Sequence, residues 1–281
     1  LEGMAQALFQ SWFVDFDPVL DNALAADNPI PDELADRAAV RRQALDNGTA
    51  NREAAKHFPA TFQLTEELGW IPDGWMKRTV EEVCDVIVDC PHSTPKWTES
   101  GVMVIRTTNF KDGMLDFNEI RYTDEEHYKK HIARAVPVAG DVILTREAPM
   151  GLAAIIPKGV RLCMGQRMVL LRVNPKELCN IVLYHMLLSP LVQHQISWNE
   201  GTGSTVSNIR IPVLRSLSFA VPQVESQYEM IASLQDLEER RHQNNAESQT
   251  LSELRDTLLP QLISGELRIP NAAKLADEVL A

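Results

Sequence analysis

Potential metal ligands lie close together around residue 90. Cys84, Cys90 and His92 combine thiols with an imidazole, the side chains that bind zinc most often. Their spacing fits no common zinc finger or ribbon, and no second ligand pair follows them. The histidines also form no HExxH pattern of the kind that metallohydrolases use. We therefore expect no metal site and interpret the cysteines as structural side chains in the protein interior.

Motifs of three common reactions are also missing from the sequence. The chain has no Asn-Pro-Pro or Asp-Pro-Pro step, which amino-methyltransferases use to hold a target amine. It has no GxxxxGK(S/T) loop for a nucleotide phosphate, and no Asp-x-Lys or Glu-x-Lys triplet for metal-dependent phosphodiester cleavage. We therefore expect a protein that is not an enzyme. The alternative, an enzyme with an unfamiliar site, would show activity in the isolated chain.

The charge of the chain is uneven along its length. The formal net charge is -12, which should repel a polyanion such as DNA. Residues 1–69 carry five basic and twelve acidic groups, and residues 213–281 carry six and eleven, whereas residues 70–212 carry sixteen of each. The middle segment is therefore the plausible one for contact with a nucleic acid, and its basic face has to be created by folding.

The cysteines and the apolar runs indicate a cytoplasmic protein. Four cysteines with no CxxC spacing, and no signal peptide before them, are typical of reduced thiols in the cytosol. The longest apolar stretch, residues 181–188, is much shorter than the roughly 20 residues that cross a bilayer. We therefore expect no association with a membrane.

The first 69 residues predict a helix followed by a linker. Apolar side chains recur every three or four residues over residues 1–16, which is typical of an amphipathic helix. No capping residue precedes this pattern, so we expect a helix already under way at Leu1 and a longer parent polypeptide. Residues 17–69 are rich in Ala, Asp, Asn and Pro, and we interpret them as a surface linker with one helix, from Asp32 to Leu45.

Residues 70–222 predict a mixed α+β domain. Ser/Thr-x-x-Glu patterns at Thr79 and Thr123 predict helix starts, and Asn174-Pro175 predicts a further helix near residues 176–189. A domain of about 150 residues is an ordinary size. Short apolar runs between Gly, Pro and Asp predict strands. They are VMVIRT (102–107), DVILT (141–145), LAAIIP (152–157), RMVLLRV (167–173) and LSFAVP (217–222).

The last segment, residues 223–281, predicts a long helix of the coiled-coil type. A capping box at Ser226 and Glu229 is followed by no Gly or Pro before Leu259, which predicts a helix about 50 Å long. A seam with spacings of four and three is the coiled-coil rhythm, and its polar middle can fix register and partner choice. The alternative is a solvated helix that packs on its own domain. The seam comprises Met230, Leu234, Leu237, Arg241, Asn244, Ser248, Leu251, Arg255, Leu258 and Leu262.

Segments in order along nearly the whole chain resemble the specificity subunits of type I restriction-modification systems. MAQALFQSWFVDFDPV (4–19) is similar to the end of that family's central helical spacer, and ELGWIPDGW (67–75) to the entry of a target-recognition domain. LRDTLLPQLISGEL (254–267) is similar to the end of the distal helix. Within the domain, the similar segments are DCPHSTPKW (89–97), VIRTTNF (104–110), GDVILTREAPMG (140–151), MGQRMVLL (164–171) and GTGSTVSNIRIP (201–212).

The resemblance implies a division of the chain into three parts. Residues 1–69 would be the end of the central spacer helix and a linker, residues 70–222 a target-recognition domain, and residues 223–281 the distal helical spacer. In that family the full subunit holds two recognition domains separated by two long antiparallel helices, and each domain reads half of a split target. This chain has one domain and one complete helix, so it resembles the C-terminal half, and both a fragment and a natural half-subunit fit that pattern.

The resemblance also implies a function and partners. The chain would recognise DNA without catalysis and direct methyltransferase and restriction subunits to a bipartite target. S-adenosylmethionine, ATP and Mg would be bound by those partner subunits, so we expect no cofactor on this chain. Self-association through the long helix is a further possibility. The alternative function is a coiled-coil adaptor whose middle domain binds protein, which the overall acidity of the chain favours.

Candidate DNA-binding residues lie in the segments that carry the resemblance. Bases are read by directional donors and acceptors, whereas phosphates need cations, hydroxyls or free backbone amides. Each candidate has a structural alternative: the Gly-rich segment as an ordinary connection, Asn109 as a turn former, Trp97 as a surface plug, and arginines paired with Glu147. The candidates are Lys96, Trp97, Arg106, Thr107, Asn109, Lys111, Arg146, Gln166, Arg167, Thr202, Ser204, Thr205 and Asn208.

Candidate partner-binding residues lie on the predicted C-terminal helix. A single amphipathic helix of this length needs another surface to cover its apolar positions. The candidates are Leu234, Leu237, Leu251, Leu254, Leu258 and Leu262.

Overall fold

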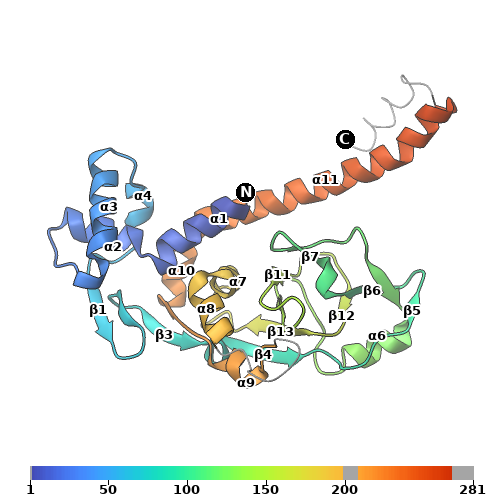
Figure 1. Ribbon diagram of the computed structural model, residues 1–281, viewed down its shortest axis with the longest axis horizontal. Coiled ribbons are helices and arrows are strands. Elements are labelled where there is room, and N and C mark those ends of the chain that lie inside the picture. The colour runs from blue at the N-terminus through green and yellow to red at the C-terminus, as the bar shows by residue number, and fades with distance from the viewer. Residues whose placement is uncertain (1, 199–207, 268–281) are drawn as a thin grey trace. The chain divides into compact units, whose positions relative to one another are not determined.

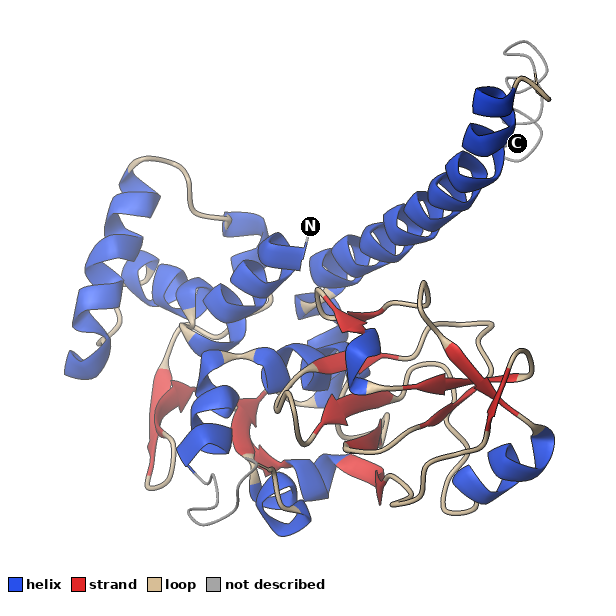
Figure 2. Ribbon diagram, turned by 45° about the vertical axis from the view of Figure 1, so that its right-hand side comes forward, coloured by secondary structure: helices blue, strands red, loops and turns tan. Residues whose placement is uncertain are grey.

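The computed structural model describes residues 2–198 and 208–267 (Figure 1). The chain divides into two compact units, residues 2–235 and the chain from Asp236 onward. The first unit combines helices with several small sheets, and a long helix forms the described part of the second (Figure 2). The predicted α+β class is therefore confirmed.

The chain begins with a helix that carries an aromatic cluster. α1 (Glu2–Phe9) continues into a π-helical turn, η1 (Gln10–Val14), and Phe16 then adopts a left-handed φ of 57°. Phe13 packs on Phe9 and on Trp75, with ring centroids 4.8 and 5.5 Å away. The predicted amphipathic helix is therefore confirmed, and its aromatic face packs against the start of the middle domain.

The surface linker expected over residues 17–69 is instead a packed segment with several helices. It contains α2 (Asp17–Ala25), η2 (Asp32–Leu34), α3 (Ala35–Asp46), α4 (Arg52–Ala55) and a hairpin of β1 (Phe62–Thr65) and β2 (Gly69–Pro72). The helix predicted from Asp32 to Leu45 is confirmed as η2 and α3. The linker expectation was wrong because charged pairs, which leave no apolar periodicity in the sequence, hold much of this segment together.

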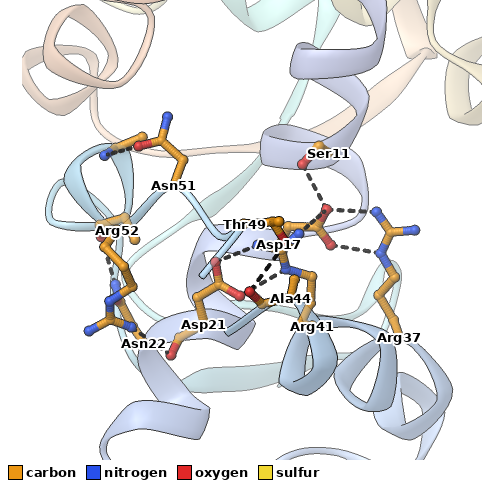
Figure 3. Close-up of polar contacts among 12 residues, drawn as sticks. Ser11, Asp17, Asp21, Asn22, Arg37, Arg41, Ala44, Thr49, Asn51 and Arg52 are labelled. Carbon is orange, nitrogen blue, oxygen red and sulfur yellow. Dashed lines mark hydrogen bonds and ion pairs between the residues drawn. The ribbon is translucent and has the colours of Figure 1, made fainter. Parts of the chain in front are cut away.

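A ladder of ion pairs joins α2 to α3 (Figure 3). Asp17 and Asp21 lie one turn apart on α2, and only 4% and 2% of their side chains are exposed. Arg37 donates to Asp17 at 2.7 and 2.6 Å, and Arg41 donates to Asp21 at 2.8 and 2.6 Å. α3 buries a single side chain, Ala38. The ion-pair ladder, rather than apolar packing, therefore holds α3 in place.

The first of two four-stranded sheets in the middle domain has the order β11-β10-β13-β4 and is antiparallel throughout. All four residues of β10 are buried, which explains its continuous apolar run. The strands are β4 (Cys84–Asp89), β10 (Val142–Thr145), β11 (Ala153–Ile155) and β13 (Met168–Val173).

The second sheet has the order β12-β6-β9-β5, with β12 parallel to β6. Ile105 and Leu162 of this sheet share an apolar cluster with Ile143 and Met168 of the first sheet. α6 (Glu125–His131) packs on the second sheet through Tyr128, which contacts a separate cluster. The strands are β5 (Trp97–Thr98), β6 (Val102–Ile105), β9 (Arg121–Thr123) and β12 (Leu162–Met164).

Smaller elements complete the first unit. β3 (Met76–Thr79) pairs with β14 (Ser218–Val221), and β7 (Phe110–Lys111) pairs with β8 (Met114–Leu115). The remaining helices are η3 (Thr107–Asn109), α5 (Val80–Val83), α7 (Asn180–Leu188), α8 (Pro190–Trp198), α9 (Ile211–Ser216) and α10 (Val224–Met230).

The predicted strands are confirmed, whereas two of the helix starts predicted within residues 70–222 are shifted. Each predicted apolar run contains a strand, namely β6, β10, β11, β13 or β14. Thr79 caps α5 in a capping box with Glu82, as predicted. Thr123, however, ends β9, and Asp124 caps α6 by accepting from His127 N at 2.8 Å. The helix expected near residue 176 begins at Asn180.

The long C-terminal helix begins later than the sequence predicts. α10 ends before Ile231 and α11 (Ala232–Ser264) follows, so the expected cap at Ser226 lies inside α10 and does not start the long helix. α11 has 33 residues, which corresponds to about 50 Å, and it continues through Pro260. Of the six candidate leucines, Leu234 is buried, Leu251 is exposed, and Leu237, Leu254, Leu258 and Leu262 are half-buried.

Candidate nucleic-acid interface

The strand order brings the ends of both sheets together. β4 and β10 both run antiparallel to β13, so each ends where β13 begins. β6 and β12 run parallel and end beside them, where Gly165 N donates to Ile105 O at 2.7 Å. We call this region the loop end of the sheets. It comprises residues 89–94, 106–109, 145–152 and 165–167.

Arg146 holds the loop end together from inside. Its Nη1 donates to Asp89 Oδ1 at 2.6 Å and its Nε donates to Ile209 O at 2.8 Å, and only 11% of its side chain is exposed. Its backbone N–H donates to Arg167 O at 2.8 Å. Arg146 therefore has the internal ion pair that the sequence left open, although the partner is Asp89 rather than Glu147.

Arg167 presents its side chain to solvent from a fixed backbone. Its φ of 69° is in the left-handed region, which costs a residue with a Cβ roughly 1 kcal/mol or more. Neighbouring backbone bonds fix this geometry, because Cys90 N donates to Met168 O at 3.0 Å and Arg146 N donates to Arg167 O. The side chain is 52% exposed, and its Nε lies 3.9 Å from Glu147 Oε2. Such a loose pair leaves the guanidinium available to a ligand.

Gln166 and His92 lie beside Arg167. Gln166 Nε2 donates to His92 O at 3.1 Å and to Thr94 Oγ1 at 3.3 Å, and this amide therefore ties the loop after β4 to the loop before β13. The His92 ring is exposed and lies 3.5 Å from Asp89 Oδ2. These groups add directional donors and acceptors to the surface around Arg167.

The segment after β6 is partly structural. Asn109 is 2% exposed, accepts from Arg106 N at 3.0 Å and donates to Asp116 O at 3.0 Å. It therefore forms the turn that was the structural alternative for this residue. Arg106 Nη2 donates to Glu119 O at 2.8 Å, Thr107 is half-buried and Lys111 is exposed on β7.

The remaining candidates divide between the second sheet and the Gly-rich segment. Lys96 is exposed, and Trp97 is 37% exposed on β5, with the guanidinium carbon of Arg121 5.2 Å from its ring centroid. Asn208 is half-buried and forms a β-bridge with Glu147. Thr202, Ser204 and Thr205 lie outside the described residues. DNA contact by each candidate stays a prediction.

The cysteines are packing groups in this structure. Cys90, Cys163 and Cys179 are buried, Cys84 is half-buried, and all four are free thiols. Burial raises the pKa of Cys84 and of Cys163 to about 12. Across residues 2–198 and 208–267, no group of three His, Cys, Asp or Glu side chains is placed to hold a metal ion. No helix in these ranges is long and apolar enough to cross a membrane.

Comparison with known proteins identifies the class of this chain. The family described as the type I restriction modification DNA specificity domain matches residues 72–253, which include both sheets and the loop end. The chain belongs to this family, which confirms the resemblance found in the sequence. Specificity subunits are non-catalytic, in agreement with the expectation that the chain is not an enzyme.

Individual relatives are similar over different shares of their length. The HindI specificity subunit of Haemophilus influenzae is 25% identical over 299 residues, covering 95% of this chain and 62% of the relative. The MjaVIII specificity subunit of Methanocaldococcus jannaschii is 20% identical, covering 73% and 49%. The crystal structure of the S subunit from M. genitalium has a TM-score of 0.47 at 17% identity, covering 72% and 48%. The chain thus spans about half to three fifths of the length of these proteins.

The sequence did not point to two residues near the candidate interface, Asp89 at the loop end and Arg121 on β9. Asp89 holds Arg146, and its position as the last residue before a Pro-rich loop could have been recognised as a strand end. Arg121 stacks on Trp97, but the three-residue strand β9 that carries it leaves no periodicity to detect. Pairing of β5 with β9 brings these two side chains together, and pairing is not visible in the sequence.

Proposed function

We propose that the middle domain reads one half of a bipartite DNA target and directs methyltransferase and restriction subunits to it. The observation that carries this proposal is the match to a DNA specificity family over residues 72–253, the range that contains the loop end. A bipartite target needs a second reading domain, which a longer parent chain or a second copy would supply. The length of the HindI relative, of which this chain covers 62%, supports that requirement.

Arg167 is the side chain best suited to read a base. A guanidinium can donate two parallel hydrogen bonds to O6 and N7 of guanine in the major groove. The Nε of Arg167 lies 3.9 Å from Glu147, so this ion pair is weak and its replacement by a base costs little free energy. Arg146 lies 2.6 Å from Asp89, so replacing that ion pair by a base would cost more. Arg146 then acts indirectly, since its backbone bond fixes the position of Arg167.

The C-terminal helix and the partners complete the proposal. The leucines of α11 would pack on a methyltransferase subunit or on another spacer helix, and the polar middle of the seam would set the register. S-adenosylmethionine, ATP and Mg would be bound by the partner subunits, and this chain would bind none of them.

Mapping methylated positions tests the proposal directly. The full chain would be assembled with its methyltransferase partner, incubated with DNA and S-adenosylmethionine, and the modified positions sequenced. We expect modification within one split sequence and a gel shift that weakens steeply as salt rises. An assembled complex that binds no DNA would instead support the adaptor, whose middle domain binds protein.

A further inference from the structure

The guanidinium of Arg121 makes a cation–π contact with an exposed aromatic ring. Its guanidinium carbon lies 5.2 Å from the ring centroid of Trp97, which is itself 37% exposed. Arg121 has no carboxylate ion-pair partner in the described ranges. Arg161, directly before β12, provides a contrast, because its guanidinium carbon lies 4.3 Å from the ring centroid of Tyr128 but the guanidinium also donates to both oxygens of Glu125. The positive charge of Arg121 is therefore available to bind an anion, whereas Glu125 already neutralises the charge of Arg161.

The pairing of the strands places Arg121 toward the loop end. Arg121 is the first residue of β9 and lies in register with Val104, one residue before the end of β6. Arg106, which follows that strand, donates to Glu119 O just before β9. Trp97 ends the loop that leaves Asp89, so the same loop links the stacked pair to the cluster around Arg167.

Stacking determines what the guanidinium can bind. An aromatic face immobilises a guanidinium and displaces water from one side, but it leaves the in-plane N–H donors free. These donors match two oxygens of a phosphate. While Arg121 stays in contact with the ring of Trp97, its reach into a groove is limited. Within the described part of the chain Arg167 has no such ring contact, so its side chain can extend further.

We propose that Arg121, positioned by Trp97, binds a backbone phosphate of the DNA next to the bases that the loop end reads. This inference rests on the proposed DNA binding by the middle domain. The phosphate contact of Arg121 does not depend on the DNA sequence. It would add to the base contacts proposed for the loop end. Trp97 acts as a positioning residue, because it orders the guanidinium without carrying charge.

Salt-dependent DNA binding tests the assignment. The full chain, assembled with its methyltransferase partner, would be titrated with target duplex and with random duplex at several salt concentrations. Arg121→Gln should lower the affinity for both duplexes by a similar factor, about three- to ten-fold, and reduce the salt slope by about one. The methylated sequence should stay the same. Trp97→Leu should lower affinity less and keep the slope, because the cation remains.

Arg161→Gln is the matched control, since it removes an arginine that also stacks on a ring but is already paired with Glu125. Its affinity and salt slope should equal those of the unmodified complex. An unchanged affinity and slope in a folded Arg121→Gln complex would overturn the inference. A loss confined to the target duplex, with an altered methylated sequence, would also overturn it by making Arg121 a base reader. If the unmodified complex itself shows no salt-dependent binding, the proposed function fails instead.

Discussion

Two arginines at the loop end have opposite surroundings, and these define their roles. Arg146 is enclosed and has a carboxylate and a carbonyl as partners, so it stabilises the frame. Arg167 is held mainly by its backbone, and its half-exposed guanidinium has one loose contact, with Glu147 at 3.9 Å. The same residue type thus stabilises the loop end at one position and presents its guanidinium to solvent at another.

Removing the guanidinium of Arg167 should affect recognition more than folding. We expect Arg167→Ala to weaken binding of the target sequence by about 1 to 3 kcal/mol, because a bidentate base contact is lost. Binding to random duplex should change less. The measurement is a pair of titrations with the methyltransferase complex, with Lys158→Ala as a control for the loss of an exposed cation in the turn between β11 and β12. Unchanged target affinity in a folded variant would refute a base contact.

Removing the side chain of Arg146 should affect folding first. Arg146→Met leaves Asp89, which is 19% exposed, without its partner, and should lower the free energy of unfolding by roughly 2–3 kcal/mol. Urea unfolding of the two proteins measures the difference. Lys130→Met, which breaks an exposed pair with Glu126 that solvent screens, should leave the free energy of unfolding nearly unchanged. Equal costs for both variants would show that the Arg146 pair is no more than a surface contact.

At the scale of elements, ion pairs rather than an apolar face stabilise the packing of α3 on α2. The buried carboxylates of Asp17 and Asp21 meet arginines at the same one-turn spacing on α3. A ladder of this kind fixes the register of two helices, because sliding by one residue would separate every pair.

Breaking one rung should loosen α3 specifically. Asp21→Asn removes the negative charge opposite Arg41 and should lower the free energy of unfolding by roughly 2–4 kcal/mol. Amide hydrogen exchange should accelerate most in α3, which buries little else. Glu53→Gln, in an exposed pair with Lys56, serves as the control and should change little. Uniform exchange rates in Asp21→Asn would contradict a local role for the ladder.

Elements with apolar signatures were predictable from the sequence, whereas the polar contacts between elements were not. β10 and β13 fill the core and leave clear apolar runs. The ion pairs between α2 and α3 leave no such pattern, and β5 and β9 are too short to show one. The observed start of a helix differs from the predicted one where a neighbouring residue is the better N-cap, as Asp124 is for α6.

The sequence predicted which segments form the candidate interface, but it did not predict the role of each residue within them. Candidates from separate segments do meet at the loop end, because strand pairing gathers the ends of β4, β6 and β10 and the start of β13. The side chain of Arg146 is enclosed because it pairs closely with Asp89, whereas Arg167 is exposed and only loosely paired with Glu147. Those contacts arise only after folding, so residue types and spacing could not separate them.

At the scale of the whole molecule, α11 is the proposed surface for assembly. Leu251 and Leu258 lie on the predicted seam, and Leu251 is exposed. Replacing both with Glu should prevent α11 from packing on a methyltransferase subunit or on another spacer helix, because buried carboxylates would lose their hydration. Sizing chromatography of the mixed subunits measures the loss. Ala246→Glu, exposed and away from the seam, should leave the complex intact. A normal complex from the double variant would refute assembly through this seam.

The left-handed backbone at Arg167 has a consequence for how such a protein could acquire a new target. The frame around this position uses the backbone of Arg167 and the side chains of its neighbours, so the side chain at 167 is replaceable. Asn tolerates a positive φ better than most residues, and its amide pairs with adenine as Arg pairs with guanine. A substitution at this single position would therefore change the group presented to the proposed DNA site while the sheets stay as they are.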